Sequence, residues 1–174
     1  MRKYLLHVLI ISFVFILILL SSPLNAQQKT TVTRIIDGDM IQVLYGGREK
    51  RVRLIGIDAP ESRVNSKAKK DKYADMSEPD LKTIIEMGKK AKAYVNGLIK
   101  RGDFITIEFD VQEMDKYGRL LGYVYLSNGK MLNEEIVKAG YADIMTLPPN
   151  VKYKDRLLEA YQEAEKDKRG LWEY

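Results

Sequence analysis

Residues 31–57, TVTRIIDGDMIQVLYGGREKRVRLIGI, carry the strand and turn signals that indicate the fold class most strongly. Residues 31–36, 40–45 and 50–57 are rich in β-branched side chains, as strands typically are. Gly46-Gly47 is a hairpin signal, and Asp37-Gly38 marks a second tight turn. We therefore expect the domain to open with three antiparallel strands.

Further elements follow along the chain and complete a small mixed domain. Apolar residues recur at helical or strand spacing in five segments, namely a helix at 81–99, strands at 104–109 and 120–126, and helices at about 131–139 and 152–168. This order suits an α+β fold, a five-stranded barrel of the oligonucleotide-binding (OB) type with three packed helices. The stretch from Ser62 to Lys72 is crowded with Lys and Arg, and we expect it to be a surface loop.

The first 26 residues have the layout of a secretory signal peptide. Arg2 and Lys3 precede a long apolar run, and Ala26 supplies a small residue at a cleavage point. An uncleaved anchor is the alternative, because the apolar run is nearly long enough to cross a bilayer. We expect cleavage, export of the chain, and a domain at residues 27–174. Cleavage would lower the basic count from 29 to 27 against 24 acidic residues, so the charge would fall from +5 to +3.

The missing residue types narrow the possible chemistry. The 174 residues contain no cysteine, and the single histidine, His7, lies in the N-terminal segment. A domain starting at residue 27 therefore has no disulfide, no thiol nucleophile, no Ser-His-Asp triad and no typical zinc site. With 45% hydrophobic residues it is long enough to form one packed core.

Acidic and basic side chains cluster near the ends of the predicted strands. Asp39 follows the first turn, Asp58 ends the third strand, and Glu61 comes directly after Pro60. Carboxylate oxygens without soft ligands favour Ca²⁺ or Mg²⁺. Arg53 and Asp58 are five residues apart, so both can serve one site only if the strand breaks. We predict that break at Gly56, because glycine permits it.

The combination resembles the staphylococcal nuclease (thermonuclease) family, whose motifs occur in the same order from about Thr31 to Trp172. The resemblance implies an active site of Arg53, Glu61 and Arg119. It also implies one Ca²⁺, with Mg²⁺ or Mn²⁺ as weaker alternatives, bound by Asp39, Asp58 and the main-chain carbonyl of Ala59. The implied activity is hydrolysis of phosphodiester bonds in DNA, RNA or both, leaving 3′-phosphate ends.

The substrate expected from this resemblance is single-stranded or locally unwound nucleic acid. Lys116 and Tyr117 are candidates for holding a substrate phosphate, although either could be turn surface. Arg119 in isolation could equally be a solvated turn residue. We expect a monomer that needs no protein partner and meets a membrane only if the N-terminal segment is retained.

Departures from the family pattern leave room for other functions. Met40 stands where the family usually has Thr, residues 143–149 lack the stacking tyrosines of the best-known members, and residues 62–79 contain an insertion. One alternative is a catalytically inactive OB-type module that binds nucleic acid or protein. Another is an exported structural protein that uses the barrel as an interaction surface.

Overall fold

The computed structural model describes residues 27–64 and 74–173. The predicted signal segment and most of the predicted loop at 62–72 therefore lie outside the described residues. The elements in chain order are β1 (Gln27–Asp37), β2 (Met40–Tyr45), β3 (Arg48–Leu54), β4 (Gly56–Asp58), α3 (Glu78–Leu98), β5 (Phe104–Glu108), β6 (Leu120–Tyr125), α4 (Leu132–Lys138), β7 (Asp143–Met145), α5 (Lys154–Lys166) and the 3₁₀ helix η1 (Gly170–Trp172). No helix among the described residues is both long enough and apolar enough to span a membrane.

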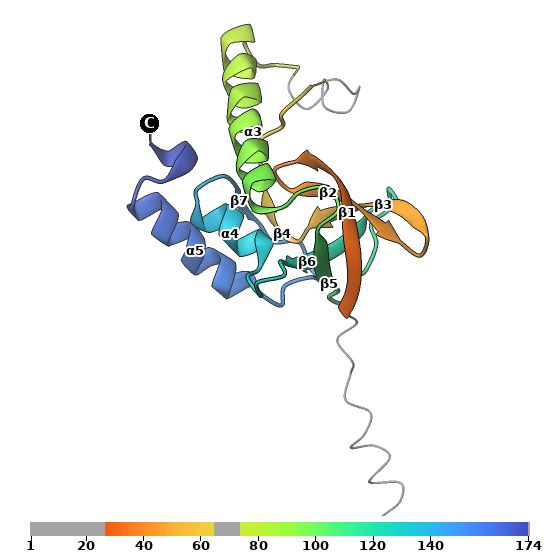
Figure 1. Ribbon diagram of the computed structural model, residues 1–174. Helices are drawn as coiled ribbons and strands as arrows, with labels where there is room; N and C mark the ends of the chain where they lie inside the picture. The colour runs from red at the N-terminus through yellow and green to blue at the C-terminus, as the bar shows by residue number, and fades with distance from the viewer. Residues whose placement is uncertain (1–26, 65–73, 174) are drawn as a thin grey trace, which may run out of the picture.

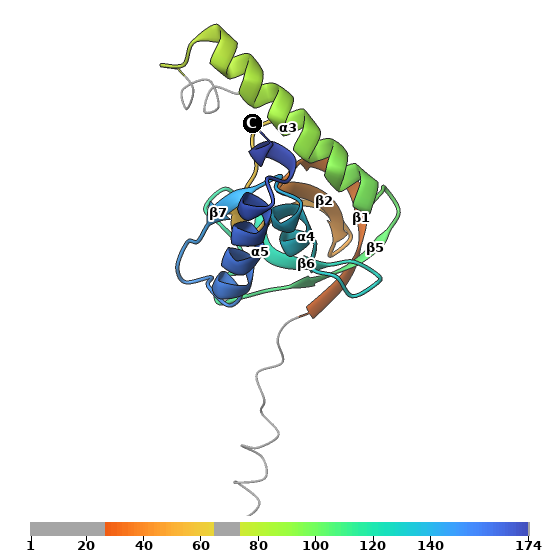
Figure 2. The same ribbon diagram turned by 90° about the vertical axis from the view of Figure 1, so that its left-hand side faces the viewer.

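Five strands close into a barrel in the order β1-β2-β3-β6-β5. All neighbouring pairs are antiparallel except β3 and β6, which run parallel. Helices α4 and α5 pack together beside the barrel, and α3 crosses one end of it (Figures 1 and 2). The predicted five-stranded barrel with three packed helices is confirmed. The short strand β7, which pairs only with β4, was not predicted.

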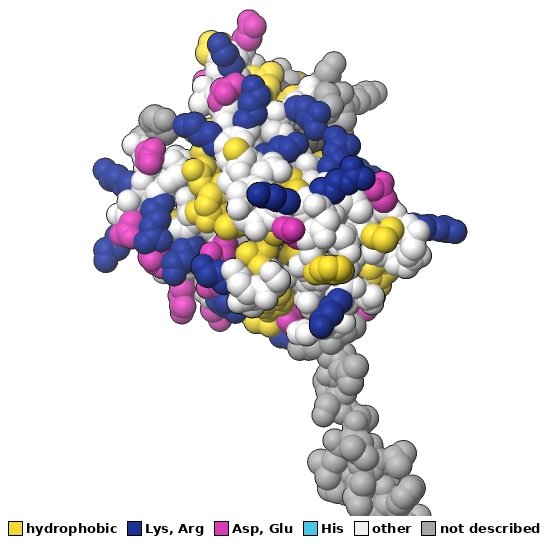
Figure 3. All heavy atoms as spheres, in the orientation of Figure 1, with side chains coloured by type: hydrophobic (Ala, Val, Ile, Leu, Met, Phe, Trp, Pro, Cys, Tyr) yellow, Lys and Arg dark blue, Asp and Glu magenta, His cyan; other side chains and the backbone are white. Residues whose placement is uncertain are grey.

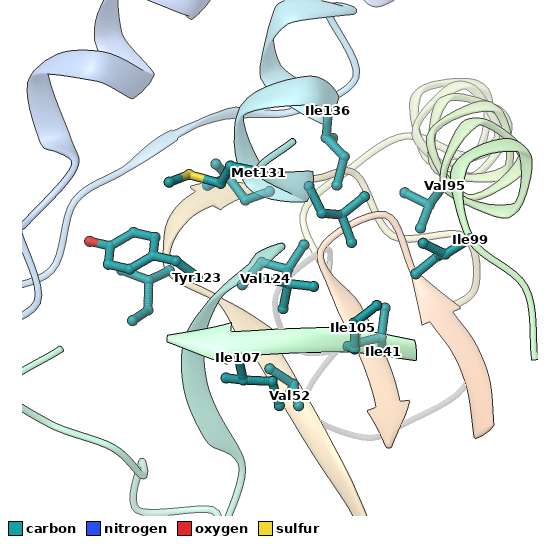
Figure 4. Close-up of a cluster of buried hydrophobic side chains, with 14 of the residues drawn as sticks. Ile41, Val52, Val95, Ile99, Ile105, Ile107, Tyr123, Val124, Met131 and Ile136 are labelled. Atoms are coloured by element: carbon teal, nitrogen blue, oxygen red, sulfur yellow. The ribbon is translucent and has the colours of Figure 1, made fainter. Parts of the chain in front are cut away.

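The barrel interior is filled by branched aliphatic side chains that alternate along each strand. Ile41, Val52 and Ile107 are fully buried inside it, and Figure 4 shows Val95 of α3 and Ile99, directly after the helix, pointing toward the same cluster. Burying one such side chain is worth about 1.5–3 kcal/mol.

Local sequence signals also account for the start of helix α3 and for packing near the C-terminus. Helix α3 begins at the Ser77 cap, whose Oγ accepts a hydrogen bond from the Asp80 N–H (3.3 Å), with Pro79 in the first turn. Tyr161 and Trp172 contact each other edge to face at 5.3 Å, as expected for packing aromatics.

Candidate active site

The Asp-Gly-Asp turn between β1 and β2 forms hydrogen bonds with residues 59–62. Asp37 Oδ1 accepts a hydrogen bond from the Ser62 N–H (2.9 Å), and Asp39 Oδ2 accepts one from the Ala59 N–H (3.0 Å). A Cβ on Gly38 would lie 2.7 Å from the Ala59 Cβ. Glycine is therefore required for this close approach, and the motif positions residues 59–62 as well as turning the chain.

The predicted break at Gly56 is confirmed. Strand β3 ends at Leu54, Gly56 has φ +83°, and β4 leaves the barrel to pair with β7. This left-handed conformation is favoured by glycine, and a Cβ there would also meet Leu157 Cδ1 at 2.5 Å. The break brings Asp58 back beside Arg53 instead of placing it on the opposite face.

Arg53 joins the two predicted metal-binding carboxylates. Its Nη1 lies 2.6 Å from Asp39 Oδ2, and its Nη2 lies 2.7 Å from Asp58 Oδ1. Nη1 also donates to the Ile57 carbonyl (2.8 Å). The planar guanidinium is well suited to such forked contacts. Asp39 and Asp58 thus lie close in space, both bound by the Arg53 guanidinium.

Asp39 is the most electrostatically constrained of these acids. Burial raises its pKa above the ordinary value, and the nearby Asp58 and Asp37 carboxylates add to the rise. Arg53 and the Ala59 N–H act in the opposite direction without cancelling it. A cation beside Asp39 would therefore favour the ionised form and relieve the repulsion among the carboxylates.

The oxygen donors here fit a hard divalent ion better than a soft one. Asp39 and Asp58 supply two carboxylates on either side of the Arg53 guanidinium. Within the described part of the chain, no three acidic or histidine side chains form a metal-binding group. The fit accordingly depends on two carboxylates completed by main-chain oxygen and water, an arrangement that Ca²⁺ and Mg²⁺ both accept.

Arg119 is held by the turn that precedes β6. Its Nε donates to Asp115 Oδ2 (2.6 Å), while Asp115 Oδ1 accepts the N–H groups of Tyr117 (2.9 Å) and Arg119 (3.0 Å). Burial alone would raise the pKa of Asp115, but these hydrogen bonds outweigh burial and lower it. Asp115 therefore stays ionised and orients Arg119. Sequence inspection assigned Asp115 no such role.

Glu61 is placed by a close contact with α3. Gly88 lies against the Glu61 backbone, where a Cβ would come within 2.3 Å of the Glu61 carbonyl carbon. The Glu61 side chain is half-buried and lines the same cleft as the two arginines. Glu61 and Asp58 therefore line the same cleft.

Most of the predicted site residues line one cleft of about 600 Å³. It is lined by Asp39, Arg53, Asp58, Glu61, Lys116, Tyr117 and Arg119. Ala59 lines a smaller neighbouring pocket, which it shares with Asp58. Met40, which departs from the family pattern, also lines the cleft. The predicted residues that line the cleft therefore come from strands β3 and β4 and from three connecting segments.

The far wall of the cleft was missed by sequence inspection. Asn150 and Gln112 exchange two 2.8 Å hydrogen bonds, from the Gln112 N–H to Asn150 Oδ1 and from Asn150 Nδ2 to the Gln112 carbonyl. Glu108 anchors the same loop through Lys152 Nζ (2.5 Å) and the Tyr153 hydroxyl (3.0 Å). These contacts join residues about 40 positions apart, and no local pattern signals them.

Comparison with known proteins gives consistent matches. Residues 51–174 match the sequence model of the family described as Staphylococcal nuclease homologue. The chain is 34% identical over 149 residues to the thermonuclease of Staphylococcus hyicus, covering 85% of this chain and 78% of that protein. It is 34% identical over 142 residues to the thermonuclease of Staphylococcus intermedius (82% and 74%) and 35% identical over 157 residues to the endonuclease YncB of Bacillus subtilis (87% and 66%).

Proposed function

The chain belongs to the staphylococcal nuclease family, and from this membership we propose that it is a calcium-dependent nuclease that hydrolyses phosphodiester bonds in DNA, RNA or both. The observation that carries the proposal is the cleft in which Arg53 and Arg119 face the carboxylates Asp39, Asp58 and Glu61. A pure binding module has no need for this combination of charges.

Arg53 and Arg119 would stabilise the phosphoryl group as it reacts. Attack on a phosphodiester builds negative charge on the phosphoryl oxygens, and guanidinium groups already fixed in place stabilise that charge without reorganising. Arg53 is fixed by two carboxylates and a carbonyl, and Arg119 by Asp115. Both arginines are thus oriented before substrate arrives.

Glu61 would accept a proton from the attacking water or orient it. Its half-buried side chain reaches the cleft from a backbone clamped between Gly88 and the Asp37 turn. General bases contribute about 10²–10⁴-fold to such reactions. Attack in line with the leaving 5′-oxygen would leave 3′-phosphate ends.

Asp39, Asp58 and the main-chain carbonyl of Ala59 would hold one Ca²⁺, with Mg²⁺ or Mn²⁺ as weaker substitutes. The ion would supply Lewis-acid stabilisation of the phosphoryl oxygens. The buried Asp39 supports this assignment, because burial and the neighbouring acids keep its pKa raised even with Arg53 2.6 Å away, so a divalent cation would further favour its ionised form.

Lys116 and Tyr117 would hold a substrate phosphate or base beside Arg119. The Tyr117 ring is 66% exposed and lies 5.2 Å from Lys116 Nζ and 5.4 Å from Arg119 Cζ. The two cations would contact the phosphate backbone and the Tyr117 ring would stack on the face of a base. Such contacts suit single-stranded or locally unwound DNA and RNA.

We further propose export through the N-terminal segment, residues 1–26, with action as a monomer. The support is the charged start, the apolar run and the small residue Ala26. A membrane would be involved only if the segment were retained.

The experiment that tests these roles compares calcium binding with cleavage in three variants. Glu61→Gln and Arg119→Ala should bind Ca²⁺ like the wild type in isothermal titration but lose cleavage of single-stranded DNA by about 10²-fold or more. Asp39→Asn should lose calcium binding and cleavage together. Products should prime polymerase extension only after phosphatase treatment. Full activity in Glu61→Gln and Arg119→Ala would overturn the assignment.

A further inference from the structure

The outer face of β1, β2 and β3 carries basic side chains that the catalytic cleft does not use. In β3 the residues Glu49, Arg51 and Arg53 point outward, while Val52 and Leu54 are buried. In β2 the outward residues are Met40, Gln42 and Leu44. Figure 3 shows several Lys and Arg side chains gathered over the region where Figure 1 draws β1 and β2 beside the lower end of α3.

The strand register places two arginines on either side of one uncharged residue. Arg34 of β1 pairs with Gln42 of β2, and Gln42 pairs with Arg51 of β3. With neighbouring strands about 4.8 Å apart, the Cα atoms of Arg34 and Arg51 are about 10 Å apart. Both arginines are exposed, so a ligand can reach both.

In the part of the chain that the structure describes, Arg34 and Arg51 differ from four other arginines of the domain in having no carboxylate partner. Arg53, Arg119, Arg156 and Arg169 each form an ion pair with a carboxylate. Across residues 27–64 and 74–173, by contrast, no carboxylate forms an ion pair with Arg34 or Arg51. Glu49 lies on the same outward row, but its carboxylate accepts a hydrogen bond from Gln42 Nε2 (2.7 Å). Two exposed guanidinium groups therefore remain available for an external anion.

The row leads directly out of the catalytic cleft. Met40 and Arg53 are partners in the β2–β3 register and both line the cleft. Two residues further along, about 7 Å away, the next outward pair is Gln42 and Arg51. A single-stranded nucleic acid whose scissile phosphate lies at Arg53 would contact Arg51 and then Arg34 as it leaves the cleft. In OB-type barrels the second and third strands commonly form such a binding face.

Resting on the proposed nuclease function, we propose that Arg51 and Arg34 form a second phosphate subsite that binds the backbone of a single-stranded substrate beyond the cleavage site. Guanidinium groups contact phosphate oxygens in a forked geometry and do not contact the bases. The subsite therefore raises the affinity for longer nucleic-acid strands and adds little sequence preference. The nuclease would accordingly favour strands long enough to span both sites.

Binding without cleavage tests the subsite independently of catalysis. A labelled 15-nucleotide DNA strand is titrated in the presence of chelator over a range of KCl concentrations, using the wild type, Arg51→Gln, Arg34→Gln and the double variant. Each lost phosphate contact should reduce the slope of log K against log salt by about 0.7, and by about 1.4 in the double variant. At 0.1 M salt this corresponds to about fivefold weaker binding for each contact.

The matched control removes the same charge from a different face. The control is Lys166→Gln, at the exposed C-terminal end of α5. This helix contacts α4, β4, β7 and η1 and does not belong to the barrel. Lys166→Gln should leave the salt slope unchanged. Arg51→Lys, which keeps the charge, should recover most of the slope. Thermal melts should coincide for all these variants because the altered side chains are exposed.

Cleavage by the calcium-loaded protein gives the second measurement. KM for the 15-nucleotide strand should rise in the double variant while kcat stays constant, and cleavage of a three-nucleotide strand should not change. An unchanged salt slope in the double variant, or an equal loss in Lys166→Gln, would overturn the subsite. If the variants show the predicted reductions in slope but the wild type does not cleave the 15-nucleotide strand, the nuclease proposal is refuted and the subsite stands.

Discussion

Gly88→Ala is the substitution that most sharply links packing to activity in this protein. A Cβ at Gly88 would lie 2.3 Å from the Glu61 carbonyl carbon, 2.4 Å from its oxygen and 2.5 Å from the Ser62 nitrogen. Ordinary contact begins at 3.4 Å, so the Glu61 backbone must move by about 1 Å. A displacement of that size at a reacting group costs about 10²-fold in rate.

The stability change combines two opposing terms. Overpacking costs about 1–3 kcal/mol, whereas replacing a helical glycine with alanine contributes about 1 kcal/mol in favour of the folded state. The net loss is therefore up to about 2 kcal/mol. At about 3 °C per kcal/mol for a domain of this size, Tm should fall by up to about 6 °C.

Gly97→Ala is the matched control in the same helix. A Cβ at Gly97 meets nothing within 4 Å, so only the helix-propensity term remains and Tm should rise by about 3 °C. Circular dichroism melts and initial cleavage rates on single-stranded DNA measure both effects. If Gly88→Ala kept the wild-type kcat and gained as much stability as Gly97→Ala, the proposed clamping of Glu61 by α3 would be refuted.

Two further substitutions test contacts around the cleft. Glu108→Gln should lower the free energy of unfolding by about 2 kcal/mol at pH 7, because it removes the charge that binds Lys152 and Tyr153. Burial alone would raise the pKa of Glu108, but hydrogen bonds from these partners lower it below 4.5. The stabilisation that the ionised Glu108 provides is therefore complete above pH 4.5 and is lost as pH falls through the lower folded pKa. Urea melts of wild type and variant should accordingly converge in acid. A constant difference in the free energy of unfolding down to pH 2 would contradict this. Asp115→Asn should lower kcat about tenfold with little change in Tm, because Arg119 loses its charged anchor while the Oδ1 turn contacts remain. An unchanged kcat would show that Arg119 needs no such anchor.

The barrel was predictable because its signals are local. Alternating β-branched residues, Gly46-Gly47 and the helical periodicity of residues 81–99 are each contained in a short stretch. The break at Gly56 followed from a conflict between strand alternation and a shared role for Arg53 and Asp58, and glycine was the residue able to resolve it.

The contacts that complete the site were not predictable because they join distant segments. Strand β7 has three residues and exists only through pairing with β4. Gly88 reads as an ordinary helical residue until the Glu61 backbone is placed against it. Asp115 had a weak local signal, its spacing of four from Arg119, and that spacing could have suggested an ion pair.

Cleavage of single-stranded DNA by the wild-type domain, residues 27–174, with Ca²⁺ and then with excess chelator tests the central claim most directly. We expect cleavage with Ca²⁺, loss of cleavage with chelator, and recovery when Ca²⁺ is restored. A folded sample that cleaves neither DNA nor RNA with Ca²⁺, Mg²⁺ or Mn²⁺, or one that cleaves equally well in chelator, would contradict it.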